Sequence, residues 1–177
     1  MRRRLTSNEV AEAKLVFADS LTYKEIWIYE NTSFPNWIGR IGSLISKEDP
    51  PTKNAISLGK RLFFPVILET APVDIANLHL TDMGWLIHEL THAWQYQHTG
   101  IRYLFDAIRA QISLGSGAYD YGSKKGLEDA HHEGKHFIDY NPEQQADIAR
   151  AYYFRLKKGE DISAWEPFIE EIKSIVD

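Results

Sequence analysis

Cysteine is absent from the 177-residue sequence. This absence excludes a disulfide framework, and it also excludes thiolate ligands for zinc. A metal ion in this protein would therefore have to be held by histidine and carboxylate side chains, and the chain has seven histidines. The lack of cysteine is compatible with a reducing cytosol.

Long apolar runs are also missing. None approaches the roughly 20 residues that a membrane-spanning helix needs. No apolar segment of the kind found in a cleavable signal peptide follows the basic residues Arg2, Arg3 and Arg4. We therefore expect no membrane insertion and a cytoplasmic location in the producing cell. Secretion would require a route that does not use a cleavable signal peptide.

Positive charge is the third scarce feature. Lysine and arginine number 20 against 25 aspartates and glutamates, which gives a net charge of −5. Such a chain has no electrostatic footprint for a phosphate backbone, so we expect no nucleic-acid partner. Hydrophobic residues make up 44% of the sequence, which is enough for a core at this length. We expect one domain that spans residues 1–177.

The segment from Leu86 to Gln95 reads LIHELTHAWQ and contains an HExxH motif. On a helix, His88 and His92 are four residues apart, so both imidazoles can bind one tetrahedral Zn²⁺, and Glu89 lies beside the same site. Apolar neighbours indicate a buried helix, as expected for the active-site helix of a metallopeptidase. The alternative is that two core histidines only hydrogen-bond to neighbouring groups.

A second motif begins at Asn141, in the segment NPEQQAD. Asn141 as N-cap, Pro142 at the first helical position and Gln144 as the capping-box partner predict the start of a helix. Glu143 then lies in the first turn and Asp147 lies one turn further on the same face. We predict Glu143 as the third zinc ligand, and Asp147 as the acceptor of the free ring N–H of a ligating histidine.

Two other groups are further candidates for the site. His131, His132 and His136 form a second cluster, but charged neighbours surround it, as on a solvated helix face. Two hypotheses for this cluster are that it binds a metal ion, or that His132 lies beside the reacting carbonyl. Tyr119 and Tyr121 lie in the glycine-rich loop 115–122, which could border the cleft and supply transition-state or substrate contacts.

The remaining pattern predicts an α+β fold, in which a small, mostly antiparallel sheet packs against the HExxH helix. The expected strands are 25–29, 55–58 and 61–64, the last two separated by Gly59-Lys60 as two strands or as one bulged strand. The expected helices are 7–20, 82–98, 102–114, 142–158 and one that begins at Ser163 with Glu166 as its capping partner; a short helix or turn is expected at 41–45.

Together the two motifs resemble those of a gluzincin-type zinc metallopeptidase. His88-Glu89-x-x-His92 is followed by Glu143-x-x-Ala146-Asp147, which is similar to the ExxAD of membrane-associated HExxH peptidases. With the segments 26–29, 55–64 and 92–95, the chain is also similar to small bacterial domains of unknown function that carry an HELTHxxQ motif. Those domains accompany polymorphic toxins and contractile injection systems, including relatives of the type VI (Vgr) spike protein. The resemblance covers roughly residues 25–155, and it implies a zincin-like fold, metallopeptidase activity and a secretion or toxin context.

Two functions from different classes follow as hypotheses. The first is a zinc-dependent metallopeptidase that hydrolyses peptide bonds with a metal-activated water, acting as a secretion-associated effector or processing protease; Glu89 is its catalytic base. Its partners would be a protein or peptide substrate, and a spike, toxin or immunity protein. The second is a non-catalytic adaptor in which zinc only fastens the fold. The presence of Glu89 favours the enzyme, because a purely structural site does not need a base.

Overall fold

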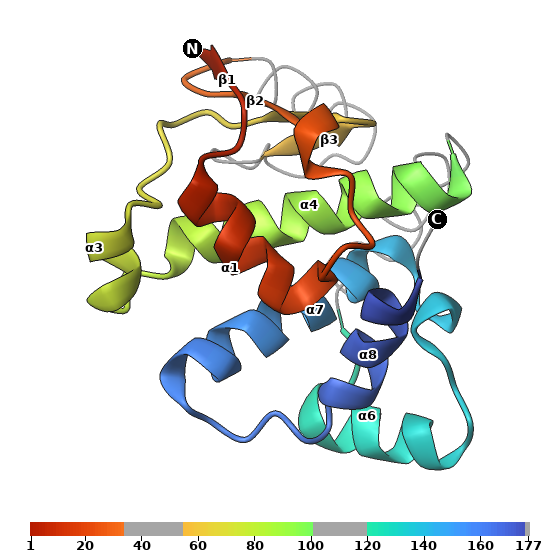
Figure 1. Cartoon of the computed structure of the whole chain (residues 1–177). Helices are drawn as coiled ribbons and strands as arrows, with labels where there is room; N and C mark the ends of the chain where they lie inside the picture. Colours follow the sequence, from red (N-terminus) through yellow and green to blue (C-terminus); the bar gives the residue numbers. More distant parts are fainter. Residues whose placement is uncertain (34–54, 101–119, 176–177) are drawn as a thin grey trace, which may run out of the picture.

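The computed structural model describes residues 1–33, 55–100 and 120–175, and it has an α+β architecture (Figure 1). Helix α4 (Thr81–Thr99) carries the HExxH segment and runs between a small sheet and a group of C-terminal helices. Every residue from Leu86 to Gln95 is buried. The predicted helix over 82–98 is thus confirmed, and it forms the centre of the described fold.

The described strands form one four-stranded sheet with the order β1-β2-β4-β3. They are β1 (Arg2–Arg3), β2 (Trp27–Tyr29), β3 (Ile56–Leu58) and β4 (Arg61–Phe63). β1–β2 and β3–β4 are antiparallel, whereas β2 and β4 are parallel. Two of the three pairings are thus antiparallel, as expected, while the parallel pairing of β2 with β4 makes the sheet mixed.

Glycine at position 59 separates β3 from β4, so two strands are present rather than one bulged strand. Gly59 has a φ of +62°, a conformation that residues with a Cβ rarely adopt. The ring of Tyr96 on α4 lies against this turn, 3.2 Å from where a Cβ would stand. The hairpin turn is thereby packed directly on the helix that carries the candidate site.

Strand β1 was not predicted from the sequence, because two consecutive arginines give no strand pattern. The guanidinium of Arg3 binds both carboxylate oxygens of Glu9 at 2.7 and 2.8 Å, and it also binds Glu30 at 2.7 Å. Glu9 is fully buried, and it also closes a capping box with Thr6 at the start of α1. The buried charges thus hold the first residues against β2 and helix α1 (Ser7–Phe17).

Four further helices lie in the described residues. They are α3 (Pro72–Ala76), α6 (Ser123–His132), α7 (Pro142–Lys158) and α8 (Glu166–Ser174), with single 3₁₀ turns at Tyr23–Glu25 and Phe137–Asp139. Helix α1 ends three residues before the expected end, because Ala18 has a φ of +46°. The predicted helix from Ser163 begins instead at Glu166, and no side chain caps it. The expected segments at 41–45 and 102–114 lie outside the described residues.

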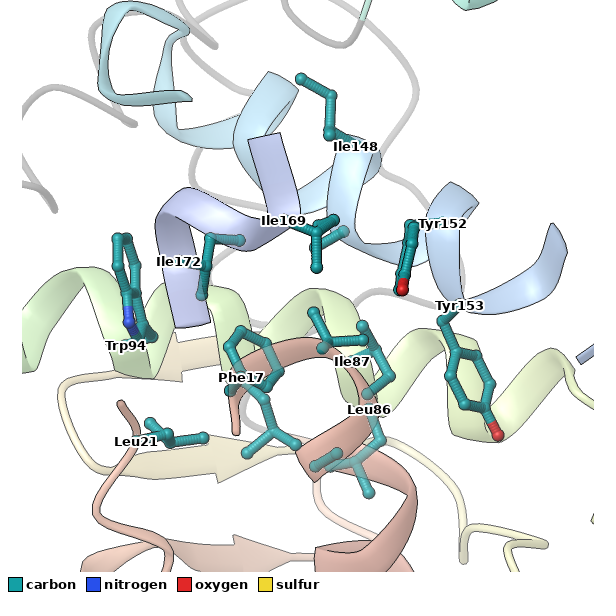
Figure 2. Packing of buried hydrophobic residues seen from close by; sticks show 14 of the residues in the cluster. Phe17, Leu21, Leu86, Ile87, Trp94, Ile148, Tyr152, Tyr153, Ile169 and Ile172 are labelled. Atoms are coloured by element: carbon teal, nitrogen blue, oxygen red, sulfur yellow. The ribbon is translucent and has the colours of Figure 1, made fainter. Parts of the chain in front are cut away.

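The core fills the space between α1, α4, α7 and α8 (Figure 2). Among its members are apolar side chains on the facing sides of these helices and in the adjoining turn: Phe17, Leu21, Leu86, Ile87, Trp94, Ile148, Tyr152, Tyr153, Ile169 and Ile172. Gly84 permits the closest approach of α7, because a Cβ there would lie 2.1 Å from the ring of Phe154. This packing holds the first turns of α7 beside the histidines of α4.

Candidate metal centre

His88 and His92 lie on one face of α4, as their spacing predicts. Their ring centroids are 5.0 Å apart, and the rings are nearly perpendicular. Only 8% of His88 and 7% of His92 is exposed. Two imidazoles held together in a dry environment require a common partner, because burial of unpaired polar groups is costly.

Glu143 is that partner, and it comes from α7. Asn141 Oδ1 accepts a hydrogen bond from the Gln144 amide at 2.9 Å, and Pro142 opens the helix, so the predicted start is confirmed. Glu143 Oε2 lies 3.3 Å from His88 Nε2 and 3.6 Å from His92 Nε2. Among the described residues, these three side chains form a buried group whose ligand atoms all lie within 4.8 Å of one another.

The donor set fits a zinc ion. Ligands about 2.0–2.1 Å from a tetrahedral Zn²⁺ lie about 3.3 Å from one another. The two Nε2–Oε2 distances, 3.3 and 3.6 Å, are close to that edge length without any movement of the backbone. Two imidazole nitrogens and one carboxylate oxygen are ligands that zinc and other divalent metal ions accept. The group can therefore hold a metal ion.

The outer nitrogen of each histidine has a partner. His88 Nδ1 lies 3.0 Å from Asp147 Oδ1, as predicted for Asp147. Arg150 Nη2 lies 2.9 Å from the same oxygen. His92 Nδ1 lies 2.9 Å from Gln95 Oε1. The sequence analysis did not identify Arg150 or Gln95, although each is three residues from its partner on the same helix and spacing alone could have indicated them.

Glu89 follows His88 on the same buried stretch of α4. It is 5% exposed, and its Oε2 atom has no hydrogen-bond partner among residues 1–33, 55–100 and 120–175. Ser57 on β3 donates to the backbone carbonyl of Glu89 at 2.9 Å, which ties the sheet to this turn of α4. Burial raises the pKa of the Glu89 carboxyl above its usual range.

Glu143 favours the protonated form of both histidines, and both histidines favour the ionised form of Glu143. Burial opposes ionisation of Glu143, but the positive charge of His92 and the hydrogen bond from His88 lower its pKa well below the usual range. Burial also opposes protonation of His88, but hydrogen bonds to Asp147 and Glu143 raise its pKa to about 9. The charge of Glu143 likewise raises the pKa of His92 against the effect of burial. Without a metal ion, protonation of the histidines thus balances the negative charge of the buried Glu143 carboxylate.

We expect the metal-free protein to lose stability as the pH rises. The folded pKa of His88, about 9, lies above the value of about 6.5 in the unfolded chain. Its stabilisation is complete below pH 6.5 and is lost as the pH rises through about 9, up to about 3 kcal/mol. Urea unfolding of metal-free protein between pH 6 and 9.5 measures this slope. The change of the unfolding free energy with pH should be smaller with saturating zinc or in His88→Ala. A free energy of unfolding that does not change with pH in the metal-free wild type would contradict the prediction.

The predicted role of Asp147 gives a second expected result. Asp147→Ala should weaken zinc affinity by about 10- to 100-fold, because a partner that orients a ligating histidine typically contributes this much. Competition with a chromophoric chelator measures the affinity. Asp129→Ala is the control, because Asp129 is exposed on α6 and pairs with Lys125. Complete loss of zinc would instead indicate that Asp147 is itself a ligand.

The three remaining candidates are placed as follows. Tyr121 is half-buried, and its hydroxyl accepts a hydrogen bond from Trp165 Nε1 at 3.4 Å. Burial raises the pKa of the Tyr121 hydroxyl, and the charge of Asp147 adds to this rise. His132 is exposed at the end of α6, and within the described part of the chain it belongs to no metal-binding group. Tyr119 lies outside the described residues.

Comparison with known proteins gives one similarity. The chain is 28% identical over 176 residues to the type VI secretion system spike protein VgrG2b of Pseudomonas aeruginosa strain PAO1. The match covers 97% of this chain but only 15% of the spike protein. No protein-family model matches the chain, and no solved structure gives a significant match. Within the described residues, no helix is long and apolar enough to cross a membrane. The chain thus resembles one stretch of a much longer secretion-spike protein.

Proposed function

We propose that the protein is a zinc-dependent metallopeptidase with a zincin-like arrangement of its site. His88, His92 and Glu143 would hold the metal, and their spacing fits a tetrahedral ion. A bound Zn²⁺ supplies Lewis acidity, which polarises a peptide carbonyl and makes a water molecule more acidic. The observation that carries the proposal is Glu89, a buried carboxylate beside the ligands with an oxygen that has no partner within the described residues.

Proton transfer and the orientation of the metal ligands are the roles of other side chains of the site. Glu89 accepts a proton from the attacking water through Oε2 and then delivers it to the leaving amine nitrogen. Burial raises the pKa of Glu89, which is the direction that helps a carboxylate return a proton after it has accepted one. Asp147 and Gln95 hold the histidine rings so that both Nε2 atoms face Glu143. The apolar packing of α4 keeps these groups in place.

The similarity to a secretion spike supports the biological context. We propose that the peptidase works with a type VI secretion system, as an effector or as a processing protease. The alternative is an adaptor that binds a spike or toxin protein and keeps zinc only as a fastener. The same similarity favours that alternative, since the named relative is a spike protein. Glu89 supports the peptidase.

Chelation tests the proposal directly. The untagged protein with one equivalent of zinc should cleave an unstructured protein substrate, and mass spectrometry should identify new fragment ends. Removal of zinc by a strong chelator should abolish cleavage, and added zinc should restore it. If zinc binds with one ion per chain and no substrate in a broad peptide panel is cleaved, the adaptor becomes the better explanation.

A further inference from the structure

The side-chain amide of Gln95, which contacts His92, belongs to a series of hydrogen bonds that reaches the start of α7. We call this series the amide relay. Gln95 Nε2 donates to the Pro142 carbonyl at 3.0 Å and to Gln145 Oε1 at 2.8 Å. Gln145 Nε2 donates in turn to the Tyr140 carbonyl at 2.8 Å. Gln95 is 3% exposed and Gln145 is 6% exposed. The chain of contacts therefore lies in the interior, between α4 and the first turn of α7.

The direction of every bond in this relay follows from its two ends. A backbone carbonyl can only accept, so the atom of Gln145 that faces the Tyr140 carbonyl must be the amide nitrogen. The oxygen of Gln145 then faces Gln95 and requires the amide nitrogen there, as the Pro142 carbonyl also does. The oxygen of Gln95 must consequently face His92. No exchange of oxygen and nitrogen in either amide satisfies all the partners.

We propose that Gln95 and Gln145 are positioning residues that fix the tautomer of His92. Because Gln95 Oε1 can only accept, His92 Nδ1 must carry the proton, and the Nε2 lone pair is left facing Glu143. This inference rests on the metal site of the proposed function, and it adds the means by which the second histidine is kept ready to bind a metal. The backbone carbonyls of Tyr140 and Pro142, at and before the start of α7, fix the orientation of both amides and thereby the tautomer.

An amide is the side chain that can perform both tasks. A carboxylate at position 95 would accept from His92 but could not donate to α7, and a lysine would donate but could not accept. Gln95 does both, so the tautomer of His92 is tied to the docking of the helix that supplies Glu143. His88 is tied to the same helix by Asp147. Both histidines of α4 are thus held by groups that fix the position of α7.

The metal-free protein offers a sharp test of the tautomer. Glu143 lies 3.6 Å from His92 Nε2 and favours a proton there, whereas Gln95 favours a proton on Nδ1. Ring ¹⁵N NMR at a pH where His92 is neutral should show the Nδ1–H form in wild type. The Gln95→Leu variant should move to the Nε2–H form. Wild-type protein in the Nε2–H form would overturn the proposal, whether or not any variant folds.

Zinc affinity provides the second readout, measured by chelator competition. Gln95→Leu should weaken binding by about 10- to 100-fold. Gln145→Leu should have a smaller effect, because the Pro142 carbonyl still orients Gln95. Gln97→Leu is the matched control, because Gln97 lies on the same helix and its Oε1 accepts a hydrogen bond from the Thr22 amide at 2.9 Å. The zinc affinity of this variant should match that of wild type within about twofold.

Gln95→Glu separates positioning from simple packing. This variant keeps an acceptor for His92, so the Nδ1–H form and most of the zinc affinity should remain. It loses the donor to α7, so its melting temperature should fall. If Gln95→Glu loses as much affinity as Gln95→Leu, or if Gln97→Leu loses as much, the relay does not act through the tautomer. None of these readouts requires hydrolysis, so a failure of the peptidase proposal would be recognised separately.

Discussion

Replacing Glu89 with glutamine should reduce peptide hydrolysis by about 10²- to 10⁴-fold while zinc remains bound. The amide has nearly the same size but cannot accept a proton from water, so the transition state loses about 3–5 kcal/mol of stabilisation. Because burial raises the pKa of Glu89 and its Oε2 has no partner among the described residues, the neutral amide should leave the melting temperature unchanged or slightly higher. Hydrolysis rates, zinc content and thermal unfolding are measured on the same preparation.

The control for this substitution is Glu133→Gln, because Glu133 is exposed at the end of α6. It should behave as wild type in all three measurements. Both proteins should also be expressed in a susceptible bacterial compartment, with growth and proteolytic fragments compared. Equal rates and equal growth effects for Glu89→Gln and wild type, at equal zinc content, would defeat the peptidase proposal and favour the adaptor.

Removing either histidine should abolish stoichiometric zinc binding. Four-ligand structural zinc sites bind with roughly 10–16 kcal/mol, or about 3–4 kcal/mol for each ligand. Loss of one ligand should therefore weaken binding by about two to three orders of magnitude in His88→Ala, His92→Ala and Glu143→Ala. Elemental analysis of untagged protein should give one zinc per chain for wild type and close to none for the variants after dialysis.

The double variant His132→Ala/His136→Ala is the matched control for this result. Both histidines are exposed, and His136 contacts Glu171 rather than the candidate site. Zinc content should be the same as in wild type. If the double variant loses zinc while His88→Ala retains it, the metal is bound by the α6 cluster and the assignment to α4 and α7 is wrong.

Much of the site follows from local rules that the sequence contains. The four-residue spacing of His88 and His92 places them on one face of any helix, and the cap at Asn141 and Pro142 fixes where the second helix begins. The positions of Glu143 and Asp147 on α7 then depend only on helical periodicity. Capping at Thr6 and the two strands on either side of Gly59 were predictable for the same reason, since each interaction spans a few residues.

Contacts between distant segments depended on the tertiary structure. The parallel pairing of β2 with β4 and the strand made by Arg2 and Arg3 depend on partners far away in the sequence. Ser163 illustrates the opposite error, because a capping pattern was present but the helix begins at Glu166.

The amide relay shows most clearly where sequence reasoning ends. Gln95 is one of several polar residues on α4, and nothing in its local pattern indicates that its nitrogen reaches the start of α7. Only the packing of α7 against α4 brings the Pro142 carbonyl and Gln145 within hydrogen-bond distance. The sequence by itself determined which residues can bind a metal, because helix spacing is local. Tertiary packing decided how far Glu143 lies from the two imidazoles and how the Gln95 amide is oriented, because both depend on how two helices meet.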